Sequence, residues 1–367
     1  MVAFSVVSCT ALILADDPAY KRTLATLTVL DRLVISTHKA GLDKIQVIHT
    51  GNPPKLTRTH ALGIKVELLN KIPPFKEPTL LLAGNLTVRE NDLIKVIGKR
   101  GRLYNHNREA LPCGITTEWR NNFDTSLPDL PKIETQGTAK VVKDGLTAIQ
   151  AEDALWDSMG LETDSFIDQN FNRPIGRFVS KILIHTPISP NAISVIGTSI
   201  GVLAAWCFTH GEAPLMVLGA LLLQASAIVD CIDGDVARIL HKETHVGKWL
   251  DLGGEQLVHL CLVAGMAMGL HRLNDPSGPY LWLGLVAALG VVLSFLTILH
   301  AKQSKNPLPK LNSFITRNAN RDFSALLLVF AIAERVHWFF GVAVIAVNGF
   351  WIYGAWLHKK DASEEAI

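Results

Sequence analysis

Side chains able to perform chemistry gather in one stretch of the chain, between Asp230 and Glu255. Asp230 and Asp233 stand three residues apart, and Gly247, Asp251 and Glu255 follow one another in steps of four. Residues three or four apart share one face of a helix, so two facing helices would bring four carboxylates into one pocket. Carboxylate oxygens are ligands that suit Mg²⁺ or Mn²⁺. The spacing therefore predicts a divalent-metal site held by Asp230, Asp233, Asp251 and Glu255.

Small residues and one arginine accompany these acids. Gly234, Ala237 and Gly247 leave room for a ligand to lie against the backbone, and Arg238 is placed to pair with a phosphate or with a carboxylate. The apolar runs on either side are long enough to span a bilayer, where a carboxylate is costly and calls for a functional explanation. The alternative is that these charges form Asp–Arg pairs with a purely structural role.

The complete pattern is Asp-x-x-Asp-Gly-x-x-Ala-Arg, eight residues, then Gly-x-x-x-Asp-x-x-x-Glu. It resembles the motif of the CDP-alcohol phosphotransferase family, in which the last position is Asp. The resemblance implies an enzyme with two metal ions that bind the diphosphate of a CDP-alcohol. It also implies transfer of a phospho-alcohol to an acceptor hydroxyl, release of CMP, and Glu255 as the general base. Because Glu is one methylene longer than Asp, the departure implies altered acceptor choice, slower chemistry or lost activity.

The same resemblance suggests further binding residues. Asn191 ends a Thr-Pro-Ile-Ser-Pro-Asn segment similar to a family element, so it is expected to contact the nucleotide or to cap a helix. The expected nucleotide-binding residues are Asp230, Gly234, Ala237, Arg238, Gly247 and Asn191. Three basic residues after the fourth apolar run are candidates for holding an anionic acceptor, or serve only as topology signals and lipid-headgroup contacts: Lys310, Arg317 and Arg321.

Apolar runs predict the spans of the second half. Four lie near residues 192–208, 215–240, 249–270 and 281–299, and a fifth region, 323–357, is long for one span and short for two. Glu334, Arg335 and His337 interrupt that region, which favours a tight turn and a total of six spans. The basic loop with Lys302 and Lys305 is then cytoplasmic, together with both chain ends and the catalytic carboxylates. The chain is thus predicted to be an integral protein of the cytoplasmic membrane.

Large apolar residues recur at helical spacing just before the first span, and basic residues lie between them. This pattern predicts an interfacial amphipathic helix on the bilayer, with a soluble linker helix as the alternative. The apolar members are Phe171, Ile175, Phe178 and Ile182, and the basic members are Arg173, Arg177 and Lys181.

The first half of the chain alternates strand-like and helix-like runs. Residues 12–15, 44–50, 65–69 and 79–83 have the character of strands, and residues 21–39 and 88–97 that of helices. The alternation predicts a doubly wound α/β domain. Residues 41–48 resemble a strand of sugar-nucleotide nucleotidyltransferases. A domain of that type before this membrane half is similar to the bifunctional inositol-1-phosphate cytidylyltransferase / di-inositol-phosphate-phosphate synthase proteins.

The predicted organisation has three parts: a nucleotidyltransferase-like domain over residues 1–160, the interfacial helix and linker over 161–187, and an all-α transmembrane domain over 188–367. The first part departs from its expected pattern. Nucleotidyltransferases follow the first strand with a glycine-rich loop that approaches phosphate, whereas here Asp16, Asp17 and Pro18 follow it. Asn85 stands where the resemblance implies a metal-binding Asp. We therefore expect a domain that has lost cytidylyl transfer, with a divergent active transferase as the alternative.

Composition limits the partners. A formal charge of +2 gives no sign of nucleic-acid binding, and the five scattered cysteines fit a reducing compartment. The leading hypothesis is an Mg²⁺- or Mn²⁺-dependent membrane enzyme that acts on a CDP-alcohol and an inositol phosphate or lipid alcohol. Membrane lipids and a second copy of the chain, as in family dimers, are the other expected partners. The rival hypothesis is a catalytically weak nucleotide-binding scaffold or sensor.

Overall fold

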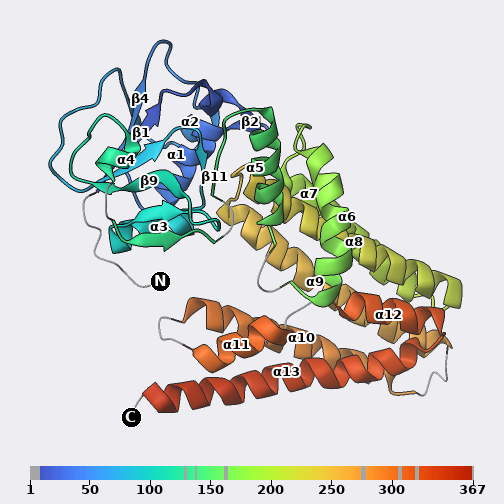
Figure 1. Cartoon of the computed structure of the whole chain (residues 1–367). Coiled ribbons are helices and arrows are strands. Elements are labelled where there is room, and N and C mark those ends of the chain that lie inside the picture. Colours follow the sequence, from blue (N-terminus) through green and yellow to red (C-terminus); the bar gives the residue numbers. More distant parts are fainter. Residues whose placement is uncertain are drawn as a thin grey trace. The chain divides into compact units, whose positions relative to one another are not determined.

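The computed structural model describes residues 9–127, 130–136, 139–160, 164–273, 278–304, 308–318 and 322–365. The chain divides into two compact units, one formed by residues 1–159 with 239–241 and the other by residues 160–238 with 242–367. Figure 1 colours both units along the sequence, and each is described by itself below.

The first unit is built on a mixed seven-stranded sheet in the order β10-β8-β9-β6-β1-β4-β5. The strand β1 is parallel to both of its neighbours, β4 and β6, whereas β9 is antiparallel to β6 and β8. This sheet confirms the predicted α/β region, and the four predicted strands are β1, β4, β5 and β6. The strand bounds are β1 (Thr10–Ala15), β4 (Ile45–His49), β5 (Val66–Leu69), β6 (Thr79–Ala83), β8 (Arg102–Tyr104), β9 (Ala110–Thr116) and β10 (Lys132–Glu134).

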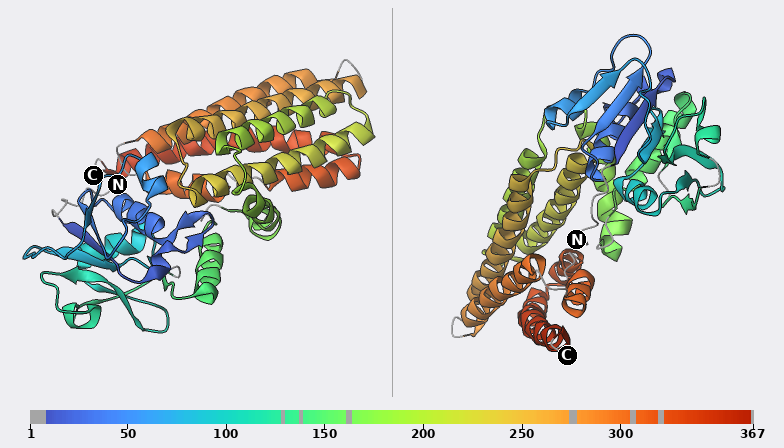
Figure 2. Two further views of the ribbon diagram at one scale, coloured as in Figure 1. Left: turned by 90° about the horizontal axis from the view of Figure 1, so that it is seen from above. Right: turned by 90° about the vertical axis from the view of Figure 1, so that its left-hand side faces the viewer.

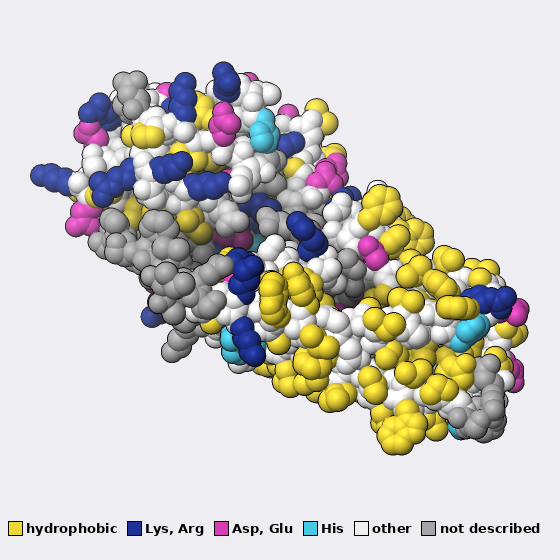
Figure 3. Space-filling model, turned by 90° about the horizontal axis from the view of Figure 1, so that it is seen from below, with side chains coloured by type: hydrophobic (Ala, Val, Ile, Leu, Met, Phe, Trp, Pro, Cys, Tyr) yellow, Lys and Arg dark blue, Asp and Glu magenta, His cyan; other side chains and the backbone are white. Residues whose placement is uncertain are grey.

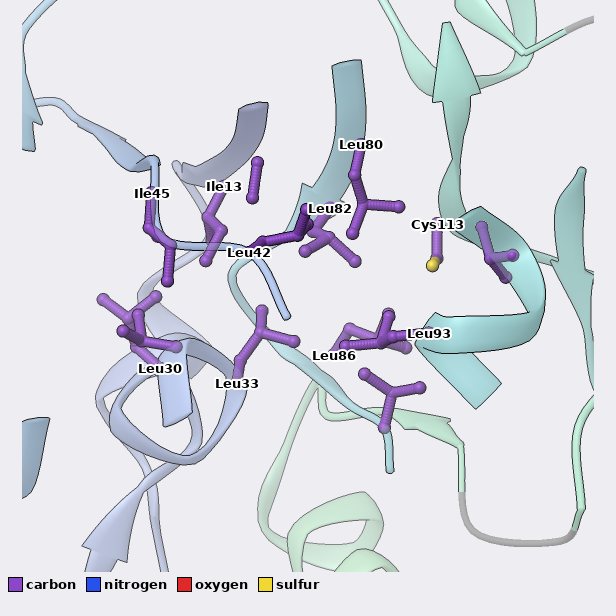
Figure 4. Close-up of a cluster of buried hydrophobic side chains, with 14 of the residues drawn as sticks. Ile13, Leu30, Leu33, Leu42, Ile45, Leu80, Leu82, Leu86, Leu93 and Cys113 are labelled. Atoms are coloured by element: carbon purple, nitrogen blue, oxygen red, sulfur yellow. The ribbon is translucent and has the colours of Figure 1, made fainter. Parts of the chain in front are cut away.

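Two helices provide much of the apolar cover of this sheet. Leu33 of α1 (Val29–Lys39) and Leu93 of α3 (Glu90–Lys99) pack with Ile13 and Leu82 from the strands, as Figure 4 shows. Cys113 lies in the same cluster, where burial raises the pKa of its thiol and keeps it a neutral packing group. The helix predicted over residues 88–97 is thus confirmed as α3.

The helix predicted over residues 21–39 begins later than expected. Its first part forms η1 (Pro18–Lys21) and a small antiparallel pair, β2 (Thr23–Leu24) and β3 (Leu27–Thr28). The Thr28 hydroxyl accepts a hydrogen bond from the backbone N–H of Asp31 at 3.1 Å and caps α1. That cap sets the true helix start. The remaining elements of the unit are α2 (Thr57–Ala61), β7 (Leu86–Thr87), α4 (Phe123–Ser126), β11 (Lys140–Val141) and α5 (Gly145–Asp157).

The second unit consists of helices. Within the described residues, five of them are long and apolar enough to cross a membrane: α7 (Pro190–Phe208), α8 (Ala213–Ile239), α9 (His245–Leu273), α10 (Tyr280–Gln303) and α13 (Val336–Glu365). The first four agree with the predicted spans. Shorter helices are η2 (Asp168–Asn172), α6 (Arg173–Leu183), α11 (Pro309–Asn318) and α12 (Phe323–Ile332).

The predicted turn near Glu334 is present, but the count of six spans is not confirmed. Backbone hydrogen bonds from Glu334 N to Ala331 O at 3.1 Å and from Arg335 N to Phe330 O at 2.8 Å close the turn between α12 and α13. However, α12 has only 10 described residues, which correspond to about 15 Å of helix, half the thickness of the hydrocarbon core. The hydropathy of residues 323–357 does not show that the turn divides them into a short helix, α12, and a long one, α13.

Apolar side chains cover much of the helical unit on the face that Figure 3 shows, and Figure 2 shows its long helices running side by side. The helix α6 and the preceding η2 also expose large apolar side chains. Phe178 is 70% exposed and Phe171 and Ile182 are exposed as well, whereas Arg173 and Ser180 are buried. A helix that exposes its apolar face and buries an arginine is suited to contact lipid rather than water.

Glycines allow α7 and α9 to pack with their backbones in close approach. A Cβ atom on Gly265 would overlap the carbonyl oxygen of Ala205, and one on Gly269 would overlap that of Phe208. Small residues at such positions are typical of helix pairs inside membranes.

Replacing Gly269 with Ala should therefore destabilise the helical unit by about 1–3 kcal/mol, because the new methyl group meets backbone that has no side-chain freedom to give way. The measurement is the thermal unfolding of the detergent-solubilised chain. Gly349→Ala on α13 is the matched control, since a Cβ there would meet nothing within 4 Å. Equal melting temperatures for the two variants would contradict the tight α7–α9 contact.

Candidate active site

Carboxylates from α8 and α9 converge as their spacing predicted. Asp230 and Asp233 of α8 and Asp251 of α9 each offer one oxygen, and these three oxygens lie within 4.8 Å of one another. Asp233 is only 7% exposed, Asp230 is half-buried and Asp251 is exposed, so the cluster runs from the interior to the surface. The Ser194 hydroxyl of α7 donates a hydrogen bond to Asp233 and orients it.

The donor set of this cluster fits a hard divalent cation. Three carboxylate oxygens at such separations repel one another, and a cation between them relieves that repulsion. Oxygen-only donors favour Mg²⁺ or Mn²⁺ over zinc. Glu255 lines the same cavity without belonging to the close group of three, so its part as a metal ligand stays a prediction.

The cavity itself is small. Its volume of about 50 Å³ is room for ions and a few water molecules. A larger ligand would therefore extend out of the cavity on the side where Asp251 is exposed.

Residues predicted to contact the nucleotide lie close to this cluster along α8 and at the starts of α7 and α9. A Cβ on Gly247 would lie 2.8 Å from Oδ1 of Asn191, so the two residues are neighbours. Asn191 is not the helix cap that the sequence left as its alternative role, because Ser189 is the N-cap of α7 and accepts from Ala192 N at 3.2 Å. Ala237 is half-buried on α8, one turn beyond Asp233.

A buried ladder of charges holds Arg238. Its Nη2 donates to Oδ1 of Asp235 at 2.8 Å, and Nη1 of Arg173 donates to the same oxygen at 2.7 Å. Arg173 also donates twice to Asp164, from Nε at 2.9 Å and from Nη2 at 2.8 Å. Arg238 in turn lies beside Gly234, whose added Cβ would be 3.0 Å from Nη1. Because Gly234 has no side chain, the guanidinium group of Arg238 can occupy this position.

This ladder was only partly visible in the sequence. The Asp235–Arg238 pair follows helical spacing, but the pairing of Asp235 with Arg173 joins residues 62 positions apart. Asp235 is 1% exposed, and as an acid outside the motif it has no family role to mark it.

The cavity has polar lining residues beyond those predicted as site residues, and His259 is one that the sequence places near the site without a role. His259 stands one turn beyond Glu255, and its ring packs edge-on against Phe323 at 5.4 Å between centroids. Ser324 donates to Gln224 at 2.9 Å, and Gln224 donates to Asn172 at 2.6 Å. A buried polar chain therefore joins the cavity to the amphipathic segment. In the sequence, only the four-residue spacing from Glu255 to His259 indicates that one of these residues faces the cavity.

The predicted acceptor residues are not brought to the carboxylates. Lys310 is half-buried and Arg317 is exposed on α11, and neither belongs to the described residues that line the cavity. Arg321 and Lys305 lie outside the described residues.

In the first unit, Asn85 has a structural role. Its Nδ2 donates to Oδ2 of Asp17 at 2.9 Å and to the carbonyl oxygen of Val142 at 2.9 Å, and the residue is buried. The other oxygen of Asp17 accepts from Ala19 N at 2.8 Å. Asn85 stands at the position of the expected metal-binding acid, and Asp17 lies in the segment that replaces the expected phosphate-binding loop. These two residues are thus hydrogen-bonded to each other.

Comparison with known proteins agrees with the motif. Residues 187–353 match the family model for CDP-alcohol phosphatidyltransferase. A bifunctional IPC transferase and DIPP synthase of Aquifex aeolicus is 26% identical over 190 residues, which are 50% of this chain and 42% of that protein. An archaetidylinositol phosphate synthase of Pyrococcus horikoshii is 30% identical over 105 residues, which are 29% of this chain and 54% of that protein.

A solved structure, phosphatidylinositol phosphate synthase of Mycobacterium tuberculosis in its apo form, aligns over 48% of this chain and 94% of its own, with 16% identity and a TM-score of 0.36. The matches span less than half the length of the bifunctional relatives. The family match covers the part of the chain that contains the motif at residues 230–255.

Proposed function

We propose that this chain is an integral membrane enzyme that moves a phospho-alcohol from a CDP-alcohol to an acceptor hydroxyl and releases CMP. The observation that carries the proposal is the meeting of Asp230, Asp233 and Asp251 within 4.8 Å, inside a region that matches the family model. Their oxygens, with Glu255 beside them, would hold two Mg²⁺ or Mn²⁺ ions. When bound, such ions neutralise the diphosphate and stabilise CMP as the leaving group.

Residues on α7, α8 and α9 bind the CDP-alcohol. Arg238, held by Asp235, donates to the diphosphate, while Gly234 and Gly247 let the nucleotide approach the backbone. Asn191 beside Gly247 contacts the nucleotide at the open side of the cavity. The phosphates of the donor reach the acids, and the rest of the molecule extends toward the side of the cavity where Asp251 is exposed.

Glu255 acts on the acceptor. Its carboxylate takes the proton of the acceptor hydroxyl as that oxygen forms a bond to the phosphorus of the alcohol phosphate. The bond between this phosphorus and the bridging oxygen breaks, and CMP leaves with the electron pair. The acceptor is either an inositol phosphate or a lipid alcohol.

The membrane arrangement is part of the proposal. The exposed apolar residues of α6 support its position at the bilayer surface, and the basic residues after α10 support a cytoplasmic active site. We further propose that α12 is the sixth helix to enter the membrane and that the enzyme works as a dimer. In the first unit, the Asn85–Asp17 pairing supports a nucleotidyltransferase-like scaffold without cytidylyl transfer.

The test is CMP release by the purified full-length chain with Mg²⁺, a panel of CDP-alcohols, and inositol phosphates or lipid alcohols as acceptors. Release that depends on both substrates supports the enzyme. The second candidate, a nucleotide-binding sensor, is favoured by Glu255 in place of Asp and by the engaged Asn85. Binding of CDP-alcohol without turnover on any acceptor would select the sensor.

The ion pairs that Asp235 makes with Arg173 and Arg238 give a prediction that separates binding of the CDP-alcohol from the chemical step. Asp235→Asn removes the carboxylate that both arginines share, so Arg238 loses its fixed position and the KM for the CDP-alcohol rises about tenfold, equivalent to about 1.4 kcal/mol. Asp235→Glu should restore part of the loss. Asp164→Asn is the matched control, because it removes a partner of Arg173 and leaves the Asp235–Arg238 contact in place. An unchanged KM in a folded Asp235→Asn variant would mean that Arg238 needs no such support.

A further inference from the structure

Two histidines from different helices face each other far from the carboxylates in the sequence. The Nε2 atoms of His300 in α10 and His358 in α13 are 2.9 Å apart, and their rings meet edge to face with centroids separated by 4.6 Å. The two helices pack side by side, as Figures 1 and 2 show. The pair is thus fixed by two long helices rather than by a loop.

The geometry of the pair suits metal binding. At 2.9 Å, one neutral imidazole donates its Nε2–H and the other accepts with its lone pair. If the donating ring takes its other tautomer, with the proton on Nδ1, both Nε2 atoms carry a lone pair that can bind one ion. Two nitrogens bound at about 2.0–2.1 Å to a tetrahedral ion stand about 3.4 Å apart, so the rings need to separate by only about half an ångström.

The surroundings place the pair at the polar end of the bundle. Lys302 follows His300 by two residues, and Lys359 and Lys360 follow His358 directly. His300 is exposed and His358 half-buried, so an ion can reach them from solvent. Among the described residues, the sole group of three or more potential ligands is the aspartate cluster, so water or an exogenous oxygen would complete the coordination here.

We propose that His300 and His358 form a surface site for a divalent transition metal, such as Zn²⁺, Ni²⁺ or Cu²⁺, that joins α10 to α13. Imidazole nitrogen selects these ions, whereas Mg²⁺ and Mn²⁺ favour the carboxylate oxygens of the active site. The two sites therefore differ in the class of ion they take. Because the new site binds across two helices in the folded state, the metal stabilises their contact.

The test uses the full-length chain purified without a histidine tag and stripped of metal with a chelator. Cu²⁺ is added in equimolar amount, and its electron paramagnetic resonance spectrum should show two equivalent nitrogen ligands. Zn²⁺ at 100 µM should raise the melting temperature of the native chain. In His300→Gln and His358→Gln, the two-nitrogen signal should be lost and the Zn²⁺ affinity should fall at least about tenfold.

His337→Gln is the matched control, because this histidine lies at the start of α13, at the opposite end of the helix. It should keep both the copper signal and the zinc-dependent stabilisation. Mg²⁺-dependent CMP release without zinc should be the same in all three variants and the native chain. The proposal is overturned if the native chain gains no stability from zinc, or if His300→Gln and His358→Gln keep the native response. The second outcome would show that the facing rings form only a hydrogen bond.

Discussion

Replacing Asp251 with Asn is expected to lower CMP release by more than about a hundredfold. The substitution keeps the shape of the side chain but removes the charge from the exposed member of the aspartate group, whose oxygens lie within 4.8 Å of one another. Loss of a partner outside the first ligand sphere already costs about 10- to 100-fold in metal affinity or activity, so loss of a direct ligand should exceed that range. The measurements are kcat with saturating CDP-alcohol and the concentration of Mg²⁺ that gives half of the maximal rate.

The control must separate the ligand role from a general effect of charge. Asp43→Asn removes an acid in the first unit whose side chain is 92% exposed and lies 3.4 Å from Nδ1 of His38. Its rate and Mg²⁺ requirement should match those of the native chain. If Asp251→Asn retained native turnover at ordinary Mg²⁺ concentrations, the aspartate cluster would not be the metal site.

The second large effect is expected at Glu255. Glu255→Gln keeps the length of the side chain but cannot take a proton, so kcat should fall by about 10²- to 10⁴-fold while the KM for the CDP-alcohol changes little. Glu255→Asp restores the residue of the family motif and tests the length of the side chain. We expect it to remain active and to change the relative rates with different acceptors.

Two outcomes would revise this role. Substantial turnover by Glu255→Gln would move the base to another group, and His259 lines the same cavity one helical turn away. If Glu255→Asp left the rate with every acceptor unchanged, the departure from the family motif would have no functional meaning. His259→Gln in the Glu255→Gln background tests the first of these outcomes, because His259 lines the cavity beside Glu255 and could take the proton in its place.

The sequence was most informative where function and helical period coincide. Asp230, Asp233 and Asp251 could be assigned to one site because residues three or four apart must share a helix face, whatever else the fold does. Strands β1, β4, β5 and β6 were predictable for a similar reason, since each is a short apolar run between polar breaks.

What the sequence did not reveal depends on contacts between distant segments. Nothing local indicates that Arg173 pairs with Asp235, because side-chain partners across 62 positions are set by how the helices pack. The same holds for the approach of Asn85 to Asp17, 68 positions apart. The short length of α12 was also hidden, because hydropathy measures the apolar content of a region but not where its backbone turns.

The close backbone contact between α7 and α9 has a consequence for access to the active site. One wall of the cavity is formed by Thr198 and Gly254, and a Cβ on Gly254 would overlap the Thr198 hydroxyl. Such a wall has no long side chains that could rearrange, so it cannot widen without separating the two helices. Entry and exit of reactants therefore use the side of the cavity where Asp251 is exposed, and not a gap between α7 and α9.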